Sequence, residues 1–170
     1  RRDILEIIRY GKQNDLWMVC GTNDALITRR LAEILKEAGL RGLALSLDAL
    51  DPKIHDRFRG VEGAWRNTVE GAQILRQTDF SFIVQTTVAK HNFREIEAIA
   101  SFAFAEMGAK VFNLYFLVPT GRGKFVSDIR PEEYKVVLDT LLRIQKTYDG
   151  KMIVNAKCAP HFSRHLFEND

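Results

Sequence analysis

The sequence predicts an α/β fold with a parallel sheet, because short apolar runs alternate with stretches of helical periodicity. The apolar runs at 16–20, 43–47, 82–88 and 111–118 are short and nearly continuous, as is typical of strands buried on both faces. Crossovers of one hand join such strands into an open doubly wound sheet or into a curved barrel. The pattern alone does not decide between these two architectures.

The intervening stretches carry helix signals of their own. Gly39 and Gly108 are placed to end two helices in the left-handed conformation. Asp51 and Pro52 have the residue types of an N-cap and a first helical position. A short strand is expected at 151–154, followed by a less regular tail. Helices are expected over 3–13, 31–38, 52 onward, 65–75, 96–107 and 131–147.

Composition bounds the class of protein. A chain of 170 residues suffices for one domain with a sizeable core. The net charge of +3 comes without a basic run, so no nucleic-acid partner is predicted. Cys20 and Cys158 are too few for a disulfide framework, which favours a reducing, cytoplasmic location. We expect no membrane span and no signal peptide, and a start at Arg1 indicates an internal piece of a longer protein.

Polar residues follow the predicted strands, whose carboxyl ends share one rim where ligands collect. Thr22 and Asn23 come after the first strand, where they turn the chain or face a ligand. Ser46 and Asp48 are two apart, so we expect both side chains on one face of the next strand. Such a pair inside an apolar strand needs a polar ligand or a buried polar network.

The third strand repeats this arrangement. Gln85 and Thr87 share one face, whereas Thr86 is expected to face the helices. Strand threonines are common for their shape alone, so Gln85 is the stronger signal. Farther on, the loop 119–123 carries Arg122, which is suited to a carboxylate or phosphate.

The histidines and cysteines give weaker signals. Cys158, His161 and His165 have the spacing C-x2-H-x3-H, which is part of a metal site without a second nearby cysteine. His55 and His91 are interpreted as solvated loop residues. Cys20, inside an apolar run, is interpreted as a small buried hydrophobe.

Four segments together resemble the radical S-adenosylmethionine (SAM) enzymes. Gly-Thr-Asn-Asp-Ala-Leu-Ile-Thr at 21–28 resembles their TNG-x-L-I-T segment, and 45–60 resembles their SLDG…P…HD-x-x-RG segment. Phe-Leu-Val-Pro-Thr-Gly-Arg-Gly at 116–123 continues the match. Cys-Ala-Pro-His-Phe-Ser-Arg at 158–164 is similar to the branch for haem biosynthesis and peptide modification, which carries extra C-terminal iron–sulfur clusters.

The resemblance implies a partial, TIM-like (β/α) barrel that lacks its first strands. Residues 1–150 would form the barrel core, and 151–170 would begin an auxiliary-cluster extension. In such enzymes a [4Fe–4S] cluster, fed by a flavodoxin- or ferredoxin-like electron donor, cleaves SAM to a 5′-deoxyadenosyl radical. That radical takes hydrogen from a small-molecule or peptide substrate, so the parent is expected to be an oxidoreductase-like enzyme of haem or peptide maturation.

The resemblance also places individual residues around the cofactors. One residue, Cys158, would be the first ligand of an auxiliary [4Fe–4S] cluster, with His161 and His165 as bystanders. The residues implied at SAM are Gly21, Thr22 and Asn23 near its methionine or ribose, Ser46 and Asp48 near its carboxylate and ribose, Gln85 and Thr87 along the cavity, and Leu117 and Val118 against adenine.

Two departures from the family pattern matter. The C-x3-C-x-x-C and Gly-Gly-Glu-Pro segments are missing, and Asp24 replaces a usual glycine. Because thiolates hold such clusters, this piece by itself is expected to be inactive. Missing first strands would leave a raw sheet edge that favours dimers. The alternatives are an ordinary TIM-like metabolic enzyme with a phosphate-bearing substrate and a non-catalytic α/β docking module.

Overall fold

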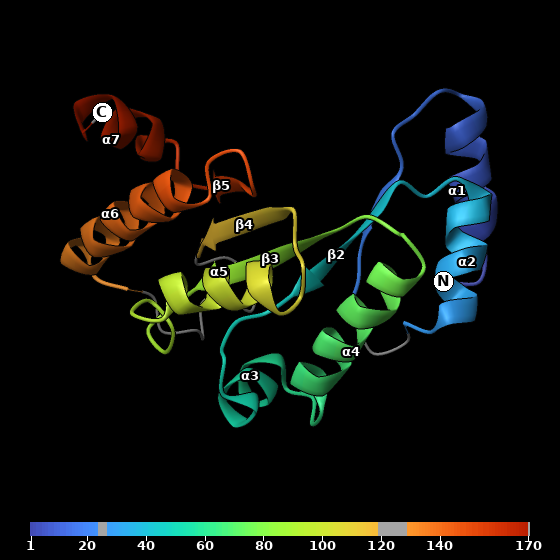
Figure 1. Ribbon diagram of the computed structural model, residues 1–170, viewed down its shortest axis with the longest axis horizontal. Coiled ribbons are helices and arrows are strands. Elements are labelled where there is room, and N and C mark those ends of the chain that lie inside the picture. The colour runs from blue at the N-terminus through green and yellow to red at the C-terminus, as the bar shows by residue number, and fades with distance from the viewer. Residues whose placement is uncertain (24–26, 119–128, 170) are drawn as a thin grey trace.

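The strands form one parallel sheet whose spatial order equals their order in the chain, β1-β2-β3-β4-β5. The fold is that of a computed structural model, which describes residues 1–23, 27–118 and 129–169 (Figure 1). A doubly wound sheet reverses its strand order at a switch point, whereas a (β/α) barrel winds in one direction. The unbroken order therefore identifies a partial barrel, as expected. The strands are β1 Val19–Gly21, β2 Gly42–Ser46, β3 Phe82–Val88, β4 Val111–Phe116 and β5 Ile153–Lys157.

The helices follow the strands in alternation and run from the α1–α2 pair at one end of the molecule to α6 and α7 at the other (Figure 1). Several ends confirm their sequence signals. The Asp51 side chain accepts from the Lys53 amide at 2.7 Å, and Gly39 has a φ of 109°. The helices are α1 Ile4–Gln13, α2 Arg29–Ala38, α3 Pro52–Arg59, α4 Ala64–Gln77, α5 Ile96–Ala105, α6 Pro131–Thr147 and α7 His161–Asn169.

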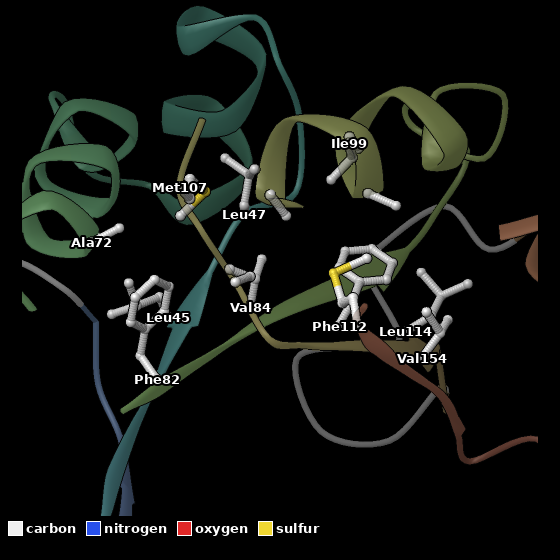
Figure 2. Close-up of a cluster of buried hydrophobic side chains, with 14 of the residues drawn as sticks. Leu45, Leu47, Ala72, Phe82, Val84, Ile99, Met107, Phe112, Leu114 and Val154 are labelled. Atoms are coloured by element: carbon white, nitrogen blue, oxygen red, sulfur yellow. The ribbon is translucent and has the colours of Figure 1, made fainter. Parts of the chain in front are cut away.

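The core lies between the sheet and its helices. Figure 2 shows Leu45 and Val84 among side chains from neighbouring strands, with Ile99 of α5 packed above them. On β3, buried and half-buried residues alternate along the whole strand. The buried set includes Thr86 and faces the helices, as predicted. The Thr86 hydroxyl donates to the Leu47 carbonyl oxygen at 2.6 Å. The other, half-buried set faces the concave side of the sheet.

The first strand differs from its prediction. A buried strand was expected at 16–20, but β1 spans three residues and begins at Val19. Leu16, Trp17 and Val19 are 60%, 76% and 63% exposed. The reason is its place in the sheet: β1 is paired with β2 along one side, and the described residues place no strand on its other side. Apolarity alone cannot distinguish an edge strand from a central one.

The end of the chain is more regular than predicted. The last strand lies at Ile153–Lys157 and not at 151–154, and the tail contains helix α7. Phe162 is buried and Leu166 packs against the core, four residues farther along the same helical face. Two apolar residues are too short a pattern to stand out in a sequence. The proposed division at residue 150 stays a prediction, while β5 pairs with β4 in the same sheet.

Among the described residues, no helix combines the length and the apolarity that crossing a membrane requires.

Candidate functional site

A cavity of about 310 Å³ opens at the carboxyl edge of the sheet, where β2, β3 and β4 end. Its lining comes from strands, from the end of α3 and from the turn after β5. The cavity combines hydroxyl, carboxamide and guanidinium groups with an apolar wall. The lining residues are Ser46, Arg59, Gln85, Thr87, Tyr115, Phe116, Leu117, Val118 and Cys158.

The polar groups of this cavity follow from strand register. Ser46 pairs with Gln85 across β2 and β3, and Thr87 pairs with Tyr115 across β3 and β4. Paired residues of neighbouring strands point to the same face, so these four side chains share the concave face. The Gln85 Nε2 donates to the Tyr115 hydroxyl oxygen at 3.3 Å. Ser46, Gln85 and Thr87 thus lie together, as predicted.

Asp48 lies behind the cavity and not in its described lining. The expectation that Ser46 and Asp48 belong to one strand is wrong, because β2 ends at Ser46 and Asp48 lies beyond it. Its side chain is 0% exposed. The Thr87 amide donates to its Oδ1 at 2.8 Å, and Arg59 Nη2 lies 2.6 Å from its Oδ2. The sequence predicted either a polar ligand or a buried polar network for Ser46 and Asp48. For Asp48 the structure shows the buried network.

The main chain of Asp48 is held as firmly as its side chain. Its amide donates to His55 Nδ1 at 3.1 Å, and its carbonyl oxygen accepts from Asn92 Nδ2 at 2.8 Å. His91 Nε2 lies 3.2 Å from the same carbonyl oxygen. These contacts fix the turn that follows Ser46, and with it one wall of the cavity.

The interpretation of His55 as a solvated residue is wrong. It lies in α3, is 1% exposed, and accepts the Asp48 amide hydrogen bond through Nδ1. Burial is the main cause that lowers the pKa of His55 below its ordinary value, opposed by the nearby Asp48 charge. A neutral ring with its proton on Nε2 matches this hydrogen bond.

Arg59 is a residue of the candidate site that sequence reasoning missed. It ends α3, and its side chain is 34% exposed between Asp48 and the cavity. Its signal was the Arg-Gly pair at the end of segment 45–60, where Gly60 takes a φ of 69° and ends the helix. A guanidinium beside Ser46 gives the cavity a donor for an anionic group.

The last residue of β1 and the two that follow it lie outside this group. Gly21, Thr22 and Asn23 are not among the described residues that line the rim cavity. The Thr22 amide donates to the Ala44 carbonyl oxygen at 3.2 Å, which extends the β1–β2 ladder toward the same edge. Asp24 and the loop 119–123 with Arg122 fall outside the described residues.

A second, larger hollow of about 790 Å³ lies at the opposite end of the concave face. Trp17, Cys20 and Gly21 line it on the β1 side, and Gln85 borders both hollows. Arg41 lies 5.4 Å from the centre of the Trp17 ring. The chemically varied rim cavity is the better candidate site, since ligand sites of parallel sheets gather at carboxyl ends.

The C-terminal cysteine and histidines do not form a shared metal centre. Cys158 has a φ of 59° and lines the rim cavity. His165 Nε2 lies 2.9 Å from Asp139 Oδ1, whereas His161 packs near the Phe116 and Tyr134 rings. Across 1–23, 27–118 and 129–169, no three His, Cys, Asp or Glu residues are grouped as metal ligands.

The comparison with protein families decides the identity of the fold. The family model described as the radical SAM superfamily matches residues 1–103. The chain belongs to the radical SAM superfamily. Its segments 21–28 and 45–60, which first indicated this family, lie within the matched range.

Curated relatives show which members of the radical SAM superfamily this chain is similar to. A protein of Methanosarcina barkeri named AdoMet-dependent heme synthase is 40% identical over 164 residues, covering 96% of this chain and 46% of the relative. A protein of the same name from Oleidesulfovibrio alaskensis is 36% identical over 167 residues, covering 96% and 42%. The chain therefore spans under half the length of these relatives.

Solved structures confirm the radical SAM fold. Streptococcus suis SuiB superposes with a TM-score of 0.78 at 15% identity, covering 96% of this chain and 38% of that protein. The protein named anSMEcpe, solved with bound AdoMet, superposes with a TM-score of 0.69 at 18% identity, covering 90% and 44%. At these identities the likeness establishes the architecture alone.

Proposed function

We propose that the whole protein is a radical SAM enzyme of haem synthesis and that the rim cavity binds SAM. The observation that carries this proposal is the convergence of Ser46, Gln85 and Thr87 with the Arg59 guanidinium on one cavity at the carboxyl edge. The shared name of the relatives, which cover nearly the whole chain, supports haem as the product class.

The chemistry of the cavity suits the parts of SAM. Its carboxylate matches the Arg59 guanidinium, which Asp48 orients from behind. The ribose hydroxyls of SAM match the Ser46 hydroxyl and the Gln85 carboxamide. Its adenine ring matches the apolar wall and backbone of Leu117 and Val118. Asp48 is thus a positioning residue in this proposal, and the Thr87 amide donates a hydrogen bond to its carboxylate.

We also propose that the residues at the end of β1 contact SAM, as the family resemblance implies. Gly21, Thr22 and Asn23 lie where β1 reaches the carboxyl edge beside β2, and the Thr22 amide is held by Ala44. We place them at the methionine side of SAM, beyond the described lining of the cavity.

The iron–sulfur clusters do not fit the thiols of this chain. A [4Fe–4S] cluster, which supplies the electron that cleaves SAM in this family, is held by several cysteines. The sequence has two cysteines, Cys20 on β1 and Cys158 at the rim. Two thiols are too few to hold a [4Fe–4S] cluster. In our proposal Cys158 contributes one ligand to an auxiliary cluster, and this chain alone does not cleave SAM.

The partners complete the proposal. A flavodoxin- or ferredoxin-like protein in the cytoplasm delivers the electron. The substrate is a small molecule of the haem pathway class; a peptide substrate has weaker support here, since the peptide-bound SuiB structure shares only 16% identity.

The test uses the complete protein, prepared without oxygen and with its clusters reconstituted. We expect SAM binding, measured by calorimetry, and release of 5′-deoxyadenosine. Ser46→Ala should weaken SAM binding about fivefold, because one hydrogen bond is lost. Ser81→Ala, at the other end of the concave face, is the matched control and should leave the affinity unchanged. Iron-free protein, or equal SAM affinity in Ser46→Ala and wild type, contradicts the proposal.

A further inference from the structure

The geometry points to a carboxylate-binding subsite on the concave face of β4 and β5, made by Asn113, Tyr115, Asn155 and Lys157. The inference rests on the proposed function. The proposed function assigns groups on β2 and β3 to SAM and names none for the substrate. This inference assigns residues on β4 and β5 to the substrate.

Strand register brings the four side chains together. Asn113 pairs with Asn155, and Tyr115 pairs with Lys157, across β4 and β5. Neighbouring strands lie ~4.8 Å apart, and residues two apart on one strand are separated by ~6.6 Å. The four positions therefore outline a patch of about 5 by 7 Å, the size of a single carboxylate group with its hydrogen-bond partners.

The patch borders the rim cavity. Tyr115 lines the cavity, and so does Cys158, the residue after Lys157. Asn113 is 6% exposed, although it lies on the concave face and not among the helices. A substrate held on this patch would lie beside SAM bound over Ser46 and Gln85.

The hydrogen bonds within the patch leave two donors without an acceptor among the described residues. Gln85 Nε2 donates to the Tyr115 oxygen at 3.3 Å, and no described residue accepts the phenolic proton. Asn155 Nδ2 donates to Asn113 Oδ1 at 2.9 Å, and no described residue accepts from Asn113 Nδ2. A carboxylate accepts and never donates, so it matches both groups.

Charge favours the same ligand. Lys157 forms no ion pair with a described residue. Arg59, the cation in the described lining of the cavity, is assigned to the SAM carboxylate in the proposed function. The remaining acceptors of the patch, such as the Asn155 carboxamide oxygen, are neutral. An unpaired ammonium beside two neutral donors attracts a carboxylate more strongly than a neutral group.

The test compares an acid with its methyl ester, in which methyl groups remove the charge of the carboxylates. The complete, cluster-loaded protein is titrated with metal-free coproporphyrin III, which bears four carboxylates, and with its tetramethyl ester, and binding is followed by absorbance. We expect the wild type to bind the acid more tightly. Lys157→Met should weaken acid binding about tenfold or more and leave ester binding within about twofold. Lys157→Arg should restore the preference for the acid.

Matched variants separate charge recognition from misfolding. Lys151→Met removes an exposed lysine that precedes β5, far along the chain direction from Lys157 at its end, and should change neither ligand's affinity. Tyr115→Phe removes one hydroxyl and should weaken acid binding about fivefold. SAM affinity, measured in each variant, reports an intact fold. Equal binding of acid and ester by the wild type, or an unchanged preference in Lys157→Met, overturns the subsite. Absence of SAM binding by the wild type instead overturns the proposed function.

Discussion

At the scale of single residues, the site depends on one buried carboxylate. Asp48 is fully buried, yet each of its polar groups is held: the carboxylate by Arg59 and the Thr87 amide, the main chain by His55 and Asn92. A buried charge is tolerated when it is paired and hydrogen-bonded. The network therefore fixes the Arg59 guanidinium at the cavity wall before any ligand arrives.

Removing Arg59 should be costly because it leaves Asp48 as an unpaired buried charge. We expect Arg59→Met to lower the free energy of unfolding by about 3 kcal/mol, the lower part of the range for broken buried pairs, since Arg59 is partly exposed. Urea denaturation measures the change. Arg57→Met, on the same helix but exposed, should cost less than about 0.5 kcal/mol. Equal losses in the two variants would show that Asp48 does not need its partner.

At the scale of elements, the start of α6 is fastened to the end of β3. Glu133 accepts from the Arg130 amide at 2.7 Å, which forms a capping contact in the first turn of α6. Lys90, just after β3, donates to Glu133 Oε2 at 2.7 Å. The Arg130 amide, followed by the Lys90 ammonium, lowers the pKa of Glu133 to about 2.

This pKa shift gives a pH dependence of defined sign. The carboxyl of Glu133 titrates near 4.5 when unfolded and near 2 when folded, so its contribution is fully present above pH 4.5. It is lost as the pH falls from about 4.5 toward 2. We expect Glu133→Gln to be less stable than wild type at pH 7, with the gap closing over that window in urea titrations.

The control for this effect is the neighbouring Glu132, which is exposed and also lies in the first turn of α6. Glu132→Gln should leave the acid dependence of stability nearly as in the wild type. A gap between Glu133→Gln and wild type that stays constant from pH 7 to pH 3 would refute the role of this carboxylate.

At the scale of the whole molecule, the chain is a curved sheet with an open side. It spans under half the length of its curated relatives, and β1 has unpaired backbone groups along its outer side in the described structure. Trp17 and Val19 are strongly exposed beside that edge. Open strand edges with apolar side chains favour pairing with another strand.

We therefore expect the isolated chain to self-associate through β1. Val19→Lys should weaken this association about tenfold, because a charge on an edge strand opposes pairing. Sedimentation velocity over a concentration series measures it. Val61→Lys is the matched control, since Val61 is 49% exposed but lies between α3 and α4, away from the sheet edge. Identical association of the two variants would place the contact elsewhere.

Local sequence patterns were enough to predict the α/β class, the exact span of β3, the α6 span and the shared face of Gln85 and Thr87. These features follow from local periodicity and from residue types, which act over a few neighbouring positions. The family motifs, which are also local, led to the radical SAM superfamily.

The family resemblance already implied a partial barrel, but the exposure of β1 and the contacts of Asp48, His55 and Arg59 became apparent only in three dimensions. Strand order and edge position depend on which strands pair, and that is a matter of distant parts of the chain. The Arg59–Asp48 ion pair joins the end of α3 to the residues that follow β2, and Asn113 meets Asn155 across 42 positions. Whether a polar residue faces a ligand or a buried partner depends on such pairings, because burial is set by everything packed around it.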